Sequence, residues 1–265
     1  LLGNDLLGFT IPRYRDNFLR AVDELLPRAD VDRQTKRVHH DGSPTEVRAF
    51  LRGVPVDRIQ RVAISNATKR SASEFRDAKG IAEDRQLVLS IDWQGNLTDV
   101  YQYLQSLERM WSNARRRREE FTFVLVGGAD HPREQDQGLS ASLIRHTVDE
   151  LNDRFGTDEW RPVCLAESLT DGERYALYRD ADVGVFGSIH DSAMPAIQEF
   201  VASQSADAGS LLLSDQLATR GRFGDGALTY SPLDGESFVH SLDESLSLSP
   251  SDRRERMETL RRRVR

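Results

Sequence analysis

The stretch QLVLSIDWQGNLTDVYQYLQSLERMW (residues 86–111) joins a β-like run to a helical pattern, and this pairing decides the fold. The run from Leu87 to Ile91 is apolar and short, as expected of a buried strand. A helix is expected over 98–119, and four apolar residues would share one of its faces: Val100, Leu104, Leu107 and Trp111. The stretch therefore predicts a strand followed by a helix that packs on the sheet.

The same alternation continues along the chain. Further strands are expected at Phe121 to Val126, Val163 to Leu165, Val183 to Phe186 and Leu211 to Leu213. A helix is expected over 139–155, with an apolar face made of Leu139, Leu143, Val148 and Leu151. Strands that alternate with helices indicate a parallel sheet with helical crossovers. Ligands bind beyond the carboxyl ends of such strands, so functional side chains are expected in the turns after residues 91, 126, 165, 186 and 213.

Residues before this alternation have a different pattern. A helix is expected over 11–26, with Pro12 in its first turn and an apolar face made of Tyr14, Phe18, Val22 and Leu25. Short β-like pieces fill the region from Arg37 to Leu51, on either side of a turn at residues 41–44. Residues 53–80 are polar and are interrupted by turn-forming residues. They are interpreted as a hinge that leads into the following domain.

Composition excludes several classes of protein. With 265 residues, 38% hydrophobic and 30% charged, the chain has the make-up of an ordinary soluble globular protein. Its apolar runs are far shorter than the ~20 residues of a membrane-spanning helix. A net charge of −7 and scattered basic residues argue against a nucleic-acid partner. The run Arg115 to Arg118 is interpreted as the solvated end of a helix, with phosphate binding as the alternative.

Two further features concern the setting of the chain. Cys164 is its only cysteine, which rules out an internal disulfide and suits a reducing, cytoplasmic location; its apolar neighbours place it in a core. Trp111 and Trp160 are also expected to be core residues. The chain begins at Leu1 in an already patterned segment, so we interpret it as part of a longer protein.

Five segments resemble the trehalose-6-phosphate synthase family, glycosyltransferase family 20, and they follow the family's order. They are NDLLGFTIPRYRDNFL (4–19), LNDRFGTDEWRPV (151–163), ALYRDADVGVF (176–186), HDSAMPAIQEFVASQ (190–204) and GSLLLSD (209–215). The resemblance implies the α/β architecture named GT-B, in which two Rossmann-like domains face each other. Residues 1–60 would be the C-terminal part of the acceptor domain, and residues 66–265 the donor domain.

The resemblance also implies an activity. The family transfers glucose from UDP-glucose to glucose 6-phosphate with retention of configuration, without a metal or other cofactor. The expected partners are therefore a nucleotide sugar and a sugar phosphate, and a homo-oligomer is left open.

Two carboxylates match the acid pair of the family. Asp191 would be the catalytic residue that holds sugar hydroxyls, and Glu199 would bind the nucleotide ribose. Between them, Ser192, Ala193 and Met194 form the donor loop at a helix N-terminus, which can face a diphosphate. The alternatives are a helix N-cap for Asp191 and an ordinary surface acid for Glu199.

Two arginines are further candidates. Arg179 falls on a family arginine beside the donor site, and its alternative is an ion pair with Asp180 or Asp182. His131 aligns best with the family arginine that reaches the acceptor phosphate. Arg133 would bind that phosphate only if the alignment is shifted by two residues.

The departures from the family concern the donor diphosphate. The family motif reads valine-aspartate-arginine-leucine-aspartate-tyrosine, one variable residue, then lysine-glycine; Trp93 stands here at the arginine and Thr98 at the lysine. Hydrogen bonds to charged groups contribute about 1.5–3 kcal/mol each, so losing both would cost about 10²- to 10⁴-fold. Trp93 could instead stack on a base or sugar, with a cleft-wall or core aromatic as the alternative.

The donor loop departs as well. Pro195 lacks an N–H, which removes one donor from the anion-facing turn, and His190 replaces the usual arginine. Two hypotheses remain: an active retaining glycosyltransferase, and a catalytically silent relative that binds a sugar phosphate, a nucleotide or a partner subunit. A third, an enzyme that joins pseudo-sugars, has little support, because its known members resemble the family in keeping the basic pair.

Overall fold

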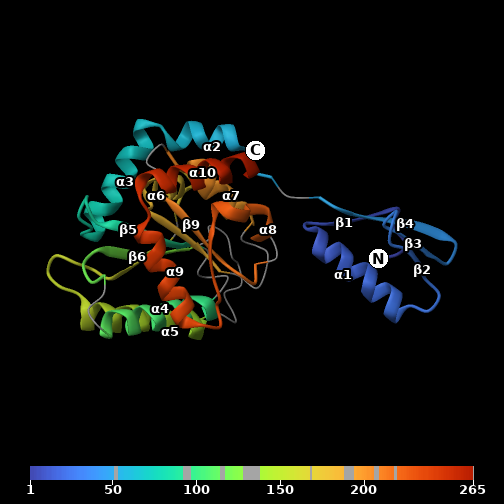
Figure 1. The fold of residues 1–265 in the computed structure, drawn as a ribbon, viewed down its shortest axis with the longest axis horizontal. Helices are drawn as coiled ribbons and strands as arrows, with labels where there is room; N and C mark the ends of the chain where they lie inside the picture. Colours follow the sequence, from blue (N-terminus) through green and yellow to red (C-terminus); the bar gives the residue numbers. More distant parts are fainter. Residues whose placement is uncertain are drawn as a thin grey trace. The chain divides into compact units, whose positions relative to one another are not determined.

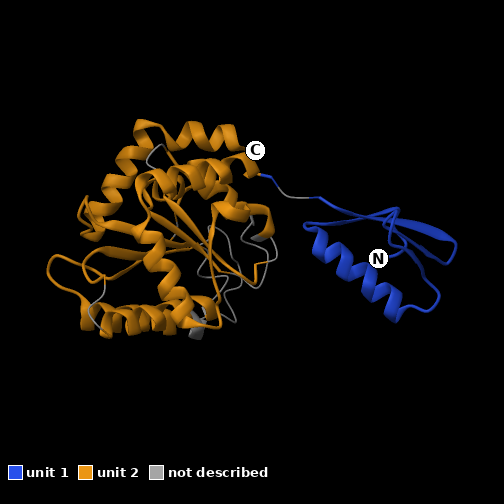
Figure 2. Ribbon diagram, in the orientation of Figure 1, with its two compact units in different colours: residues 1–53 blue, residues 54–265 orange. Residues whose placement is uncertain are grey.

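The computed structural model divides the chain into two compact units, Leu1–Gly53 and Val54–Arg265 (Figure 2). It describes residues 1–50, 53–91, 97–113, 117–127, 138–167, 169–187, 194–205, 209–217 and 220–264.

The first unit is a small sheet with one helix. In chain order its elements are β1 (Leu6–Phe9), α1 (Pro12–Leu25), β2 (Asp30–Asp32), β3 (Arg37–His40) and β4 (Ser43–Ala49). The strand order is β1-β4-β3-β2, in which β1 is parallel to β4 and the other pairs are antiparallel. Leu19, Val22, Val38 and Val47 form its core. Leu25, predicted on the apolar face of α1, is 74% exposed, because Leu19 and Val22 carry the buried face instead.

The second unit contains a six-stranded sheet whose neighbouring strands are all parallel. Its order is β10-β9-β8-β5-β6-β7. The strands are β5 (Gln86–Ile91), β6 (Phe121–Val126), β7 (Val163–Ala166), β8 (Val183–Phe186), β9 (Ser210–Ser214) and β10 (Leu228–Tyr230). The sequence predicted five of these strands, β5 to β9, and β10 was not anticipated.

Helices cover both faces of this sheet (Figure 1). They are α2 (Val56–Ala63), α3 (Asn66–Lys79), α4 (Leu97–Ser112), α5 (Gly138–Phe155), α6 (Asp171–Asp180), α7 (Met194–Ser203), α8 (Arg220–Phe223), α9 (Gly235–Ser247) and α10 (Pro250–Val264), with a 3₁₀ turn at Gly224–Gly226. One core contains residues of α2, α6, α7 and α10, and the other contains residues of α4, α5 and α9. Trp111, Trp160 and Cys164 are buried in these cores, as predicted.

The structure corrects three further sequence expectations about helices. The helix expected over 98–119 ends at Ser112, and Arg117 has a left-handed backbone (φ 59°) and forms an ion pair with Asp243 (Nε to Oδ1, 2.7 Å). Leu143 is 51% exposed, because α5 turns the neighbouring Ile144 into the core.

The third correction concerns residues 53–80, which were interpreted as a hinge and lead-in. They form α2 and α3, and Ile59 on α2 is fully buried in the core of the second unit. The division between the two compact units falls after Gly53, and the domain boundary expected from the resemblance, between residues 60 and 66, stays a prediction.

A capping box fixes the start of α6. The Thr170 hydroxyl accepts from the Glu173 backbone N–H, and the Glu173 carboxylate accepts from the Thr170 N–H (2.8 Å) and hydroxyl (2.6 Å). These two bonds from Thr170, the hydroxyl first, lower the pKa of Glu173. A pKa below its unfolded value of about 4.3 means that this stabilisation is present above that pH and is lost as the pH falls through the folded-state pKa.

Glu173→Gln is therefore expected to lower the free energy of unfolding by about 0.5–1 kcal/mol at pH 7. The difference from the unmodified protein should shrink toward zero near pH 3, as measured by urea unfolding at both pH values. Glu74→Gln, at an exposed position inside α3, is the matched control and should show no such pH dependence. An unchanged difference at pH 3 would contradict the role of the carboxylate charge.

Candidate functional site

The carboxyl edge of the six-stranded sheet is where the site was predicted, and the structure describes part of it. Glu199, Arg179 and Thr98 lie among the described residues, and Met194 is the first residue of α7. Five predicted site residues lie outside the described residues: Trp93, Arg133, Asp191, Ser192 and Ala193. The same holds for His131 and His190.

Glu199 lies on α7, the helix that follows β8 and the segment containing Asp191. Its side chain is 18% exposed and forms an ion pair with Arg174 on α6, in which Arg174 Nε and Glu199 Oε2 are 3.4 Å apart. Because α6 and α7 both begin beyond the carboxyl ends of strands, this pair lies toward the edge where ligands bind in such sheets.

The position of Glu199 is set by the close packing of α7 on β8. Phe200, the next residue, is fully buried, and a Cβ built on Gly184 of β8 would come within 2.7 Å of its ring. Only glycine therefore allows this ring so close to the strand. Because Ile197 and Phe200 hold one face of α7 in the core, Glu199 is directed away from it.

Arg179 lies at the last turn of α6, which runs from the carboxyl edge of the sheet back to the amino edge. Next to it, Asp180 forms an ion pair with Arg76 (2.6 Å). Asp182 accepts from the backbone N–H of Leu87, at the start of β5 (2.9 Å). Arg179 thus lies near the edge opposite the predicted site, and this position favours a structural role over donor binding.

The specific alternative for Arg179 was an ion pair with Asp180 or Asp182. Asp182 instead pairs with Arg253 of α10 (2.9 Å), and among the described residues neither carboxylate pairs with Arg179. The Nε atom of Arg179 is buried and has no hydrogen-bond partner within the described part of the chain.

Thr98 and Asp99 occupy the first turn of α4, directly after the segment that contains Trp93. Thr98 is exposed, whereas Asp99 is 3% exposed. Asp99 follows Thr98 at the position where the family motif has glycine. An acid in the first turn is favourable to the helix dipole, but it adds negative charge where the family binds a diphosphate.

Two buried tyrosines lie close to this carboxylate, and sequence reasoning did not identify them. The hydroxyls of Tyr103 on α4 and Tyr230 on β10 are hydrogen-bonded to each other. Burial, and then Asp99, raise the pKa of Tyr103. Burial, Tyr103, Asp99 and Asp215 raise the pKa of Tyr230. Both phenols are therefore neutral hydroxyls. The nearby carboxylates make the surroundings negative, so that a neutral polar group of a ligand is favoured there over an anion.

Gly187, the residue after β8, closes over this hydroxyl pair. A Cβ built on Gly187 would overlap the hydroxyl oxygens of both Tyr103 and Tyr230. The tyrosines thus lie directly against the backbone that leads toward Asp191.

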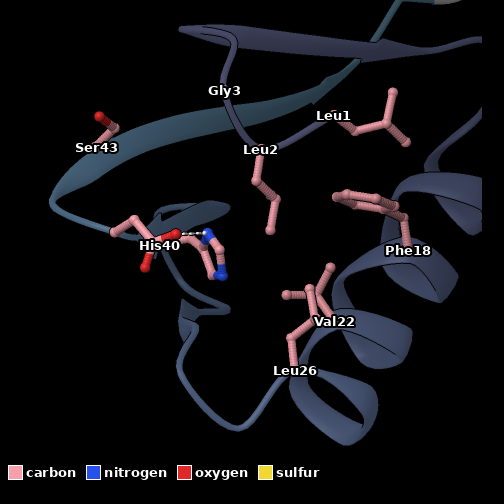
Figure 3. Close-up of a pocket in the computed structure, with 9 residues that line it drawn as sticks. Leu1, Leu2, Gly3, Phe18, Val22, Leu26, His40 and Ser43 are labelled. Carbon is pink, nitrogen blue, oxygen red and sulfur yellow. Dashed lines mark ion pairs between the residues drawn. The ribbon is translucent and has the colours of Figure 1, made fainter.

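Pockets lie in the described parts of both units, and Glu199 does not line the three described next. A pocket of about 520 Å³ in the first unit lies beside α1, with Leu2, Phe18 and Val22 pointing into it and the His40–Asp41 ion pair at its rim (Figure 3). A pocket of about 180 Å³ lies between α4 and the start of α9, and one of about 720 Å³ lies at the end of α5 near Trp160.

Neither a metal site nor a membrane span is found among the described residues. Within those ranges, no three His, Cys, Asp or Glu side chains gather as metal ligands. In the same ranges, no helix combines the length and the apolar character needed to cross a membrane.

The model of the family described as Glycosyltransferase family 20 matches residues 1–265, the whole chain. The chain belongs to glycosyltransferase family 20. This family 20 chain is 25% identical over 260 residues to an alpha,alpha-trehalose-phosphate synthase [UDP-forming] of Candida albicans, covering 96% of this chain and 52% of the relative. It therefore spans about half the length of that curated relative.

Solved structures show that the family 20 chain has the GT-B fold expected from the sequence. An alpha,alpha-trehalose-phosphate synthase from Burkholderia xenovorans in complex with glucose-6-phosphate matches 99% of this chain and 59% of its own, with a TM-score of 0.86 and 21% identity. The Escherichia coli protein bound with UDP-2-fluoro glucose matches 100% of this chain and 58% of its own, with a TM-score of 0.86 and 19% identity.

Proposed function

We propose that the chain supplies the donor half of a retaining glycosyltransferase of the trehalose-phosphate synthase type. In this proposal, glucose moves from UDP-glucose to glucose 6-phosphate without a metal. The observation that supports it best is Glu199, a partly exposed carboxylate on α7, the helix after β8. Arg174 of α6 forms an ion pair with it. A carboxylate at this edge can accept hydrogen bonds from the two hydroxyls of a ribose.

The other roles in the proposal come from the family resemblance. Asp191 would hold the sugar hydroxyls at the reacting centre, and the backbone of 192–194, at the start of α7, would face the diphosphate. Arg133 would bind the acceptor phosphate. Arg179 is left out, because it lies near the opposite edge of the sheet.

A second candidate is a silent family member that keeps the fold in order to bind a ligand or regulate a partner. The observation that favours it is the first turn of α4, where Thr98 and the buried Asp99 stand at the positions of the family lysine and glycine. A buried carboxylate disfavours an anionic diphosphate nearby, and would weaken the stabilisation of the leaving group.

The test is nucleoside-diphosphate release by the full-length protein with UDP-glucose and glucose 6-phosphate. Release that depends on both substrates would support the transferase and rule out the silent member. Release without glucose 6-phosphate would show donor hydrolysis only. If UDP-glucose gives no release with or without glucose 6-phosphate while UDP still binds, the binding or regulatory function is the better assignment.

A further inference from the structure

Arg174 is a charged group that the structure places directly against Glu199. It lies on the first turns of α6, and its guanidinium contacts two carboxylates: Glu199 (Nε to Oε2, 3.4 Å) and Asp171 (Nη2 to Oδ1, 2.7 Å). The same guanidinium lies over the ring of Tyr175, 5.5 Å from its centroid. The Arg174 side chain is only 15% exposed, so it is held on several sides.

The backbone that carries Arg174 is fixed independently of this ion pair. Its N–H donates to the Thr170 carbonyl (2.9 Å), within the capping box of α6. Leu177 and Tyr178, in the next turn, are buried in the core shared with α7. Arg174 can therefore act as a fixed point against which the Glu199 carboxylate is oriented.

The charge of Arg174 is maintained in this setting. Burial acts to lower its pKa, but Tyr178, Glu199 and Asp171 outweigh burial, so that the pKa is raised. Asp171 is 63% exposed and Glu199 is 18% exposed, which makes Glu199 the less hydrated of the two acids. An ion pair is less screened where water is excluded, so Arg174 acts more strongly on Glu199.

We propose that Arg174 is a positioning residue, which fixes the Glu199 carboxylate so that it can accept both hydroxyls of a nucleotide ribose. This inference rests on the proposed function and names a residue that the family resemblance did not. A carboxylate has about four acceptor positions, so one carboxylate can contact an arginine and also accept hydrogen bonds from a diol. Ordering the side chain before the ligand arrives removes an entropy cost from binding.

An apolar contact surface already joins α6 and α7 without this pair. Tyr178 packs against Phe200 (ring centroids 6.0 Å apart), and both are fully buried. The helices should therefore stay together when the arginine is replaced, and the expected effect is on binding.

The experiment compares the affinity of the full-length protein for UDP and for 2′-deoxy-UDP by calorimetry. The unmodified protein should bind UDP about tenfold more tightly, since the deoxy ligand loses one hydrogen bond to a charged group. Arg174→Met should reduce the affinity for UDP toward that for 2′-deoxy-UDP and leave the latter unchanged. Arg174→Lys should restore part of the preference, and Arg154→Met, which removes an exposed arginine of α5, should keep all of it.

Three results would overturn the inference, and they can be told apart. If Arg174→Met keeps the full preference for UDP, Arg174 does not position Glu199. If Arg174→Met weakens the binding of UDP and of 2′-deoxy-UDP equally, the role of Arg174 is structural. If the unmodified protein has no preference and Glu199→Gln changes nothing, the ribose role of Glu199 fails, and with it the donor site of the proposed function.

Discussion

A Trp93→Arg, Thr98→Lys double variant is expected to release nucleoside diphosphate about 10²- to 10⁴-fold faster than the unmodified protein. Each new cation would donate charge-assisted hydrogen bonds to the diphosphate, which gains negative charge as it departs. Thr98 is exposed in the first turn of α4, so a lysine can be placed there without disturbing the core. The measurement is kcat for release at saturating donor and acceptor.

A size-matched double variant without charge, Trp93→Met with Thr98→Met, is the control and should bring no gain. Asp99 follows Thr98 and would pair with part of the new positive charge, so adding Asp99→Gly should increase the gain further. If the charged double variant is no faster than the unmodified protein, the missing cations do not limit the reaction.

The second large effect is expected at Glu199. Glu199→Ala should lower kcat/KM for UDP-glucose by about 10²- to 10⁴-fold, because two hydroxyl hydrogen bonds to a carboxylate are lost. The substitution also leaves Arg174 without its most buried carboxylate partner. Steady-state rates over a range of UDP-glucose concentrations measure this change.

Glu150→Ala is the matched control, since Glu150 is an exposed acid in the middle of α5. Its kcat/KM should equal that of the unmodified protein. Glu199→Gln keeps the shape of the side chain and should be affected less than Glu199→Ala. Unchanged kinetics in Glu199→Ala would remove the observation that best supports the transferase.

Strands were the most predictable part of this fold. The run from Phe121 to Val126 is fully buried and has a strand on either side, β5 and β7, so every position is apolar apart from Thr122. Helix ends were less predictable, because α4 stops at Ser112 within a polar run that has no proline or glycine. The strand β10 was not predictable, since it has only three residues and Thr229 is exposed.

Glu199 and Arg179 were both assigned to the donor site from the family resemblance, and their roles there stay predictions. The structure shows where each one lies: Glu199 on α7, the helix that follows β8, and Arg179 in the last turn of α6. The alternation of strands and helices already indicates the position of Arg179, because a residue that ends a crossover helix lies near the start of the next strand.

Contacts between distant parts of the sequence could not be predicted from pattern. Tyr103 and Tyr230 are 127 residues apart, and each alone looks like an ordinary core aromatic. The same holds for Arg174 and Glu199, because they lie on different helices, α6 and α7, and the pattern of each helix alone does not show that they meet. Asp99 was also missed, although its position in the family motif, which belongs to glycine, could have identified it.

The packing of Gly187 against two tyrosine hydroxyls also constrains the order in which this molecule can have changed over time. A larger residue at Gly187 and the pair Tyr103–Tyr230 exclude each other, since they would occupy the same space. A glycine at position 187 is therefore a precondition for both tyrosines to be present together. Once both tyrosines are in place, a change to any larger residue at Gly187 requires at least one of them to be given up first.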